Sequence, residues 1–146
     1  MTGFEPLRRR VRPEWIDYNG HLSEAYYVLV FGFATDAVMD RIGLDHEYRS
    51  RTGCSLYTVE AHVRYLHEVG PDAELVVTSA VIGSGPKKLR LCHEMSVDGT
   101  PVATEELMAL HVDGERGGTT PLPAAIAERV AGLVTTPPDY AGRSIG

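Results

Sequence analysis

The residues from Ala25 to Ala34 constrain the fold most, because they form a nearly unbroken apolar run. Ser23 before the run suits an N-cap and Gly43 after it suits a helix stop, so we predict one helix from Ala25 to Ile42. A helix whose first half is apolar almost all round must be buried on most sides. Only its second half carries charged residues that could form a solvent-exposed face: Asp36, Asp40 and Arg41.

From Ser55 onward the hydrophobic period changes to two, which is typical of strands. With an earlier short run, the predicted strands are Leu7–Arg12, Leu56–Glu68, Glu74–Ile82, Lys88–Val97 and Val102–Val112. Their connections are too short for crossovers, so neighbouring strands should be antiparallel. A sheet can bury so apolar a helix only by curling around it. We therefore predict an α+β domain over 1–134, in which five antiparallel strands wrap the long helix.

Two further features complete the predicted organisation. Pro123 to Leu133 has apolar residues at helical spacing and predicts a short C-terminal helix, and residues 135–146 predict a loose tail. Alternation along the 56–68 strand predicts two faces. One face should carry Tyr57, Val59, Ala61, Val63 and Tyr65, and the other Thr58, Glu60, His62 and Arg64.

Composition excludes several classes of function. The chain has 146 residues, enough for one domain, and its net charge of −6 argues against nucleic-acid binding. No apolar run is long enough to cross a membrane, and the segment that begins at Met1 has no apolar signal core, so we expect a cytoplasmic protein. The two cysteines form no disulfide framework, and the histidines are too scattered for a metal site.

The loop before the long helix carries the candidate chemistry. Asp17, Asn19 and His21 lie within five residues and close to the N-terminus of the predicted helix. Backbone N–H groups at such an end are unsatisfied, so they can hold a carbonyl oxygen while a carboxylate attacks the carbon or activates water. Each residue also has a structural reading: Asp17 as a turn cap, Asn19 as a left-handed turn residue before Gly20, and His21 as a tie between loop and helix.

Four segments of the chain resemble the hotdog-fold acyl-CoA thioesterases of the 4-hydroxybenzoyl-CoA thioesterase-like superfamily. They are Asp17-Tyr18-Asn19-Gly20-His21, Tyr27 within the helix, Leu56-Tyr57-Thr58-Val59-Glu60, and Lys87-Lys88. The run from Glu14 to His21 and the run from Tyr57 to Glu60 are similar to the subgroup that hydrolyses betainyl-CoA. The resemblance covers about residues 7–125.

This resemblance implies specific roles. Asp17 falls on the catalytic carboxylate of the family, and the backbone N–H groups of Ser23 or Glu24 would hold the thioester oxygen. Lys87 and Lys88 fall where relatives carry cations for the phosphates of coenzyme A. The substrate would be an acyl-CoA, with coenzyme A as part of the substrate and no other cofactor. Family active sites lie between subunits, so the resemblance implies a homodimer or a homotetramer.

The resemblance also has one departure, which concerns the acyl group. Tyr18 and Asn19 stand where relatives of the 4-hydroxybenzoyl type have proline and small residues. An aromatic acyl substrate is therefore not implied, and a short polar acyl group such as betainyl is preferred.

Other residues near the loop have two interpretations. Glu60 is either a surface charge or a second site carboxylate. Aromatic rings beside a carboxylate could hold a quaternary ammonium group, or they could be ordinary core. These rings belong to Trp15, Tyr18, Tyr26, Tyr27 and Tyr57.

Two other functions stay open from the sequence. A hotdog hydratase or dehydratase carries an Asp-x-Asn-Pro-x-His loop, which Asp17, Asn19 and His21 echo, although Gly20 replaces the proline and the histidine comes one residue early. A non-catalytic acyl-CoA-binding protein would bind the ester without turnover.

Overall fold

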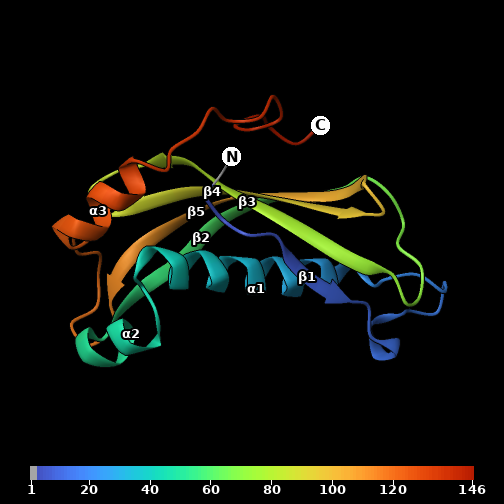
Figure 1. The fold of residues 1–146 in the computed structure, drawn as a ribbon, viewed down its shortest axis with the longest axis horizontal. Helices are drawn as coiled ribbons and strands as arrows, with labels where there is room; N and C mark the ends of the chain where they lie inside the picture. Colours follow the sequence, from blue (N-terminus) through green and yellow to red (C-terminus); the bar gives the residue numbers. More distant parts are fainter. Residues whose placement is uncertain (1–2) are drawn as a thin grey trace.

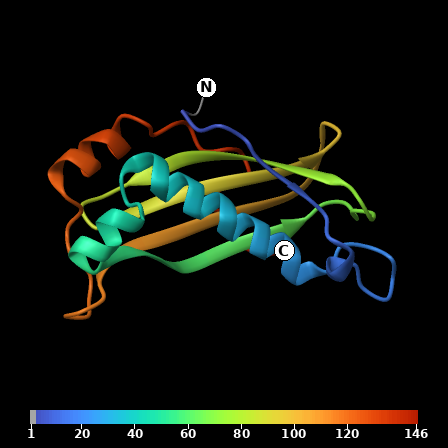
Figure 2. The same ribbon diagram turned by 60° about the horizontal axis from the view of Figure 1, so that its bottom comes forward.

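The computed structural model describes residues 3–146, so the start of the predicted 1–134 domain, at Met1 and Thr2, lies outside the described residues. One long helix, α1 (Glu24–Ile42), lies across the concave face of a curled five-stranded sheet (Figure 1, Figure 2). The strands are β1 (Leu7–Arg10), β2 (Cys54–Tyr65), β3 (Glu74–Ser84), β4 (Lys88–Val97) and β5 (Thr100–Asp113). All pairings are antiparallel, in the order β1-β3-β4-β5-β2. The predicted α+β hotdog fold is confirmed.

The helix ends follow from local chemistry. Gly43 ends α1 in the left-handed conformation, with φ of 103°, which glycine adopts without steric cost. A second helix, α2 (His46–Thr52), was not predicted; the Asp45 carboxylate caps it by accepting the N–H of Tyr48 at 2.9 Å. The C-terminal helix α3 (Ala124–Ala131) lies within the predicted range. In the part of the chain that the structure describes, no helix is long and apolar enough to span a membrane.

The core lies between α1 and the inner face of the sheet. Tyr27, Phe31 and Val38 are among the α1 residues buried there. The prediction that α1 is buried on most sides is wrong for the protomer, since Val28 remains 41% exposed and Ala25 and Gly32 are exposed beside it. The sheet covers one side of the helix and leaves this apolar side open.

The open side of α1 faces edge strand β2. The Tyr65 hydroxyl at the end of β2 donates to the carbonyl of Glu24 at 3.4 Å, and Val28 lies one turn after Glu24 on the same side of the helix. β2 pairs only with β5, so its other edge is unpaired within the protomer. An apolar helix side and a free strand edge thus adjoin.

A register shift between Thr58 and Glu60 corrects the predicted faces of β2. Tyr57 pairs with Leu110, whereas Ala61 pairs with Leu107, and these two β5 residues point to opposite faces because side chains alternate along a strand. Tyr57 therefore does not share a face with Ala61, Val63 and Tyr65. A bulge adds one residue to a strand and so inverts the alternation beyond it.

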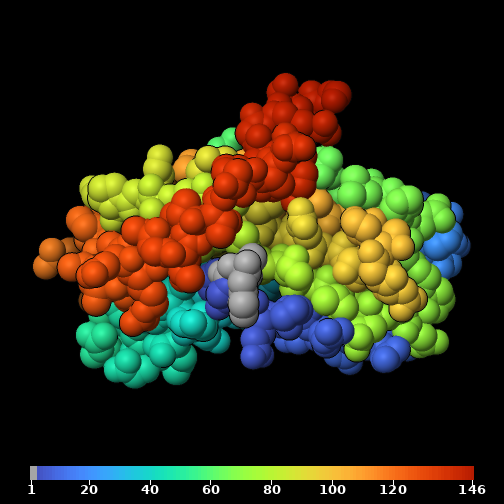
Figure 3. Space-filling view, turned by 45° about the horizontal axis from the view of Figure 1, so that its top comes forward, coloured from blue at the N-terminus to red at the C-terminus, as the bar shows by residue number. Residues whose placement is uncertain are grey.

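Residues 135–146 were predicted to form a loose tail. Instead, this C-terminal segment lies across the outer face of the sheet (Figure 3). Thr135 donates its N–H to the carbonyl of Val81 at 2.9 Å, and the Tyr140 hydroxyl donates to Glu94 at 2.6 Å. The ring of Tyr140 also stacks under the Arg64 guanidinium, 4.0 Å from its centroid. These contacts anchor the segment.

Candidate functional site

The loop that carries Asp17 is closed by its own backbone. Ile16 and Leu22 form an antiparallel bridge, the N–H of Asp17 donates to the carbonyl of His21 at 2.9 Å, and the N–H of Gly20 donates back to Asp17 at 3.0 Å. Gly20 has a φ of +79°, which favours glycine at this turn. The loop therefore holds Asp17 and His21 side by side at the entrance of α1.

The Asp17 side chain takes part in this turn. Its Oδ1 accepts the backbone N–H of Asn19 at 2.8 Å, so the turn-capping interpretation holds at one carboxylate oxygen. No described residue forms a hydrogen bond to the other oxygen, Oδ2. One oxygen thus fixes the carboxylate while the second can act on a substrate or on water.

The two backbone N–H groups that were expected to hold the substrate oxygen, those of Ser23 and Glu24, differ in whether they already have an acceptor. Ser23 is the N-cap residue but makes no side-chain cap, and its N–H donates to the carbonyl of Trp15 at 2.9 Å. The N–H of Glu24, the first helical residue, finds no acceptor among the described residues. Of the two predicted backbone donors, Glu24 is the one that is free for a substrate oxygen.

A cavity of about 610 Å³ opens at this end of the helix. Its lining residues come from the loop, from the first turns of α1 and from the end of β2. They are Asp17, Asn19, His21, Leu22, Glu24, Tyr27, Tyr65, Leu66, His67 and Glu68. Three of these are carboxylates and none is lysine or arginine. The wall is therefore acidic.

Contacts within the cavity join the loop to the end of β2. His21 Nε2 lies 3.1 Å from the Glu68 carboxylate, and the Tyr27 hydroxyl donates to the carbonyl of His67 at 3.2 Å. Tyr27 also meets Tyr65 edge to face, with ring centroids 5.1 Å apart. Burial, and to a lesser degree nearby negative charge that includes Asp17, raises the pKa of Tyr27, so its hydroxyl stays protonated.

The structure brings together only some of the predicted site residues. Asp17, Asn19, His21, Glu24 and Tyr27 line the cavity. The others that were predicted to bind substrate near the loop lie elsewhere: Trp15 stacks on Tyr26 at 5.5 Å, and neither lines the cavity. Tyr18 is almost fully exposed.

Glu60 and Tyr57 lie away from this cavity within the protomer. Glu60 pairs with Met108 and lines a separate hollow on the outer face of the sheet, with Arg90 and Glu106. Tyr57 lies on that same outer side and is 52% exposed.

Lys87 and Lys88 lie near the opposite end of β2 from Asp17. Lys88 pairs with Leu110 of β5, which in turn pairs with Tyr57 near the start of β2. The Asp17 cavity adjoins Tyr65 at the end of that strand. Figure 1 shows the same separation, with the loop before α1 and the turn between β3 and β4 at opposite ends of the molecule.

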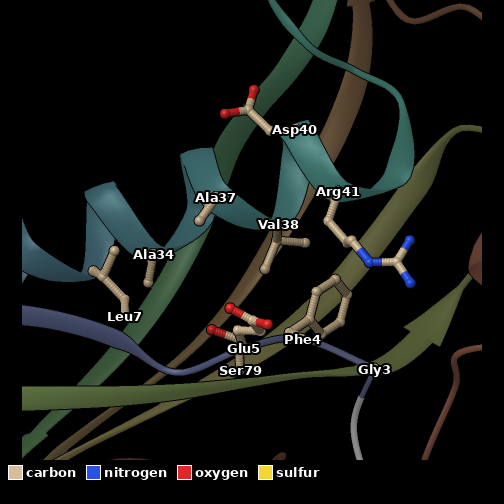
Figure 4. Close-up of a pocket in the computed structure, with 10 residues that line it drawn as sticks. All are labelled: Gly3, Phe4, Glu5, Leu7, Ala34, Ala37, Val38, Asp40, Arg41 and Ser79. Carbon is tan, nitrogen blue, oxygen red and sulfur yellow. The ribbon is translucent and has the colours of Figure 1, made fainter.

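A second cavity, of about 500 Å³, lies between the other flank of α1 and the segment before β1 (Figure 4). Ala34, Ala37 and Val38 of the helix and Phe4 of that segment line it, and it contains none of the predicted site residues. Among the described residues, no group of three or more histidine, cysteine, aspartate or glutamate side chains could hold a metal ion.

The sequence reasoning missed Tyr65 and Glu68 as members of the site. Tyr65 ends the alternating β2 pattern, and Glu68 follows three residues later. No motif or periodicity marks them: Tyr65 reaches the cavity because the end of β2 lies beside the start of α1, where its hydroxyl contacts Glu24.

The profile of the thioesterase-like superfamily matches residues 11–130. The chain belongs to this superfamily. The betainyl-CoA thioesterase of Pseudomonas aeruginosa is 40% identical over 143 residues, which cover 93% of this chain and 90% of that protein. The chain is therefore a thioesterase. The L-carnitine dehydrogenase/betainyl-CoA thioesterase of Agrobacterium fabrum is 43% identical over 148 residues, but this thioesterase chain spans only 30% of its length.

Solved structures agree with this assignment. A candidate thioesterase from Pseudomonas putida KT2440 superposes with a TM-score of 0.82 and is 39% identical, covering 96% of this chain and 94% of that one. A hypothetical protein from Staphylococcus aureus, solved in complex with CoA, superposes with a TM-score of 0.89 at 24% identity, over 97% of this chain and 93% of that one. This second likeness shows the shared fold.

Proposed function

We propose that the protein hydrolyses a small acyl-CoA thioester to the free acid and coenzyme A, with Asp17 as the catalytic carboxylate. The observation that carries the proposal is the position of Asp17, which lines a cavity at the open start of α1 and has one oxygen free of the turn. The substrate carbonyl oxygen would accept the N–H of Glu24, where the helix dipole also favours negative charge.

Two routes lead from this geometry to the products. In the first, Asp17 attacks the thioester carbon, coenzyme A leaves as the thiolate, and water then hydrolyses the mixed anhydride. In the second, Asp17 takes a proton from water as that water attacks, and the tetrahedral intermediate expels the thiolate. Both consume one water and release the same acid. Asn19 supports either route through its backbone N–H, which orients the carboxylate.

We further propose betainyl-CoA as the substrate. The relatives that match most of this chain are named for that ester. The acidic cavity wall, without lysine or arginine, supports a positively charged acyl group on physical grounds, because like charges would repel an anionic one.

The working unit that we propose is a homodimer built on the free edge of β2. Val59 of that strand and Val28 of α1 are large apolar residues left exposed beside it. An unpaired strand edge with adjoining apolar surface invites a second copy. If two β2 strands pair antiparallel, the Tyr57 end of one lies beside the Tyr65 end of the other. The Lys87–Lys88 turn of one protomer would then approach the Asp17 cavity of its partner, where it could bind phosphates of coenzyme A.

The test is a free-thiol assay with betainyl-CoA, acetyl-CoA and 4-hydroxybenzoyl-CoA. We expect rapid release of the thiol from betainyl-CoA and slow release from the aromatic ester. Crotonyl-CoA serves as the control for the hydratase alternative, because hydration would remove its enoyl absorbance without releasing thiol. No thiol release from any ester, with the esters nonetheless bound, would contradict the proposal and indicate an acyl-CoA-binding protein.

A further inference from the structure

We propose that Tyr65 is the residue that selects for a quaternary ammonium head group, by presenting its aromatic ring beside the helix entrance where the thioester carbonyl would lie. The proposal rests on the proposed thioesterase function and deepens it. It assigns substrate selection to the end of β2 rather than to the aromatic residues of the loop.

The position of the ring is fixed from two sides. Its hydroxyl donates to the carbonyl of Glu24 at 3.4 Å, and its edge-to-face contact with Tyr27 has an interplanar angle of 89°. Tyr27 is almost fully buried, whereas Tyr65 is 45% exposed and lines the cavity. Tyr65 is therefore the ring of the pair that can still receive a ligand.

Electrostatics around the ring favour a cation. Burial raises the pKa of Tyr65, and the neighbouring carboxylates of Glu24 and Glu105 raise it further, which places negative charge close to the ring. Glu68 adds a third carboxyl group, which lines the cavity and lies 3.1 Å from His21 Nε2. Glu68 is largely exposed, so water weakens its effect, and Glu105 contributes only the fraction that is ionised, because burial raises its pKa to about 7.

The chemistry of the head group explains why a ring is needed. A trimethylammonium group has no N–H to donate, so it cannot form hydrogen bonds with carboxylates. It binds instead through diffuse charge and through contact with aromatic faces. In a betainyl ester a single methylene separates the nitrogen from the carbonyl carbon. A carbonyl oxygen held at the N–H of Glu24 thus brings the cation close to the Tyr65 ring, because the Tyr65 hydroxyl donates to the backbone carbonyl of the same Glu24.

The decisive experiment compares betainyl-CoA with 3,3-dimethylbutanoyl-CoA, in which an uncharged carbon replaces the nitrogen at the same shape. We expect the wild type to prefer the charged ester in kcat/KM. The variant Tyr65→Leu should lower this preference by about threefold to thirtyfold, the range expected of one cation–π contact. Tyr65→Phe is the matched control, because it keeps the ring and loses only the hydroxyl, so it should keep most of the preference.

A second measurement separates selection from turnover. Dissociation constants of both esters with Asp17→Asn, and with Asp17→Asn Tyr65→Leu, should give the same change of ratio by calorimetry. Equal efficiency of the wild type on the two esters, or an equal loss on both in Tyr65→Leu, would overturn the inference while the thioesterase proposal stands. If neither ester releases thiol, both proposals fail together.

Discussion

His93 and Glu105 face each other across β4 and β5 beneath α1, yet the two ring nitrogens of His93 bond elsewhere. Nε2 lies 2.8 Å from the Thr35 hydroxyl, and Nδ1 lies 2.7 Å from the Ser79 hydroxyl. Burial favours the neutral form of this ring, which lies beside a buried carboxyl group.

Burial acts on the two groups in opposite directions. It lowers the pKa of His93 from 6.5 to about 4 and raises the pKa of Glu105 from 4.5 to about 7. Between about pH 4 and 6.5 the unfolded chain holds a proton on His93 that the folded chain lacks, so stability rises with pH. Between about pH 4.5 and 7 the folded chain holds a proton on Glu105 that the unfolded chain lacks, so stability falls with pH.

These opposed slopes predict the behaviour of Glu105→Gln. Removing the carboxyl leaves the His93 slope alone, so the free energy of unfolding should rise from about pH 4 to 6.5 more steeply than in the wild type. Relative to its value at pH 4.5, the variant should gain about 1–3 kcal/mol over the wild type by pH 7.5. Urea unfolding at fixed protein concentration and several pH values measures this. Glu128→Gln, an exposed change on α3, is the control, and parallel wild-type and Glu105→Gln profiles would show that Glu105 ionises normally.

The variant Asp17→Asn tests the catalytic carboxylate. We expect kcat to fall about a thousandfold, because the amide can neither attack nor take a proton. The amide oxygen can still accept the N–H of Asn19, so the loop should keep its shape, and calorimetry should show nearly unchanged affinity for coenzyme A. Asp36→Asn, an exposed change on α1, should leave kcat unaltered. Retained turnover in Asp17→Asn would remove Asp17 from the mechanism.

Joint substitution of Lys87→Ala and Lys88→Ala tests the site proposed for the phosphates. KM for the acyl-CoA should rise about threefold to tenfold while kcat changes little, and the rise should be larger at low salt, because salt screens exposed charges. Arg8→Ala on β1, at the far edge of the sheet, serves as the control. The idea fails if KM shows the same salt dependence in the wild type and the double variant.

The variant Val59→Lys tests the proposed dimer. Val59 is 52% exposed at the bulge of the free β2 edge, so a lysine there should oppose pairing of two copies. Sedimentation should show a shift from dimer to monomer, and kcat/KM should fall at least about tenfold if the partner completes the site. Val134→Lys places the same charge on an exposed apolar residue after α3 and should change neither. A wild type that sediments as a monomer would contradict the proposal directly.

The sequence was sufficient for the architecture because periodicity and turn chemistry act locally. The predicted range of β4 agrees with the structure at both ends, and Asp98 and Gly99 adopt positive φ at the predicted hairpin. α2 was missed because seven residues are too few to show helical periodicity, and the capping contact of Asp45 is visible only in the structure. The cytoplasmic location stays a prediction.

The site was less predictable because it depends on register. Asp17, Asn19 and His21 are neighbours in sequence, so their grouping could be anticipated. Tyr65 joins them only because of strand pairing, and the bulge near Val59 moves Tyr57 to the other face. Neither effect has a signal in composition or spacing.

The bond from the N–H of Ser23 to the carbonyl of Trp15, with the stacking of Trp15 on Tyr26, ties the loop and the first turn of α1 into one rigid piece. The residues at 65–68 belong to a different strand and a different connection. Under the proposed roles, a substitution in that short stretch would change the acyl group that is accepted, and its contacts with His21, Glu24 and Tyr27 would carry the change to the loop and to α1.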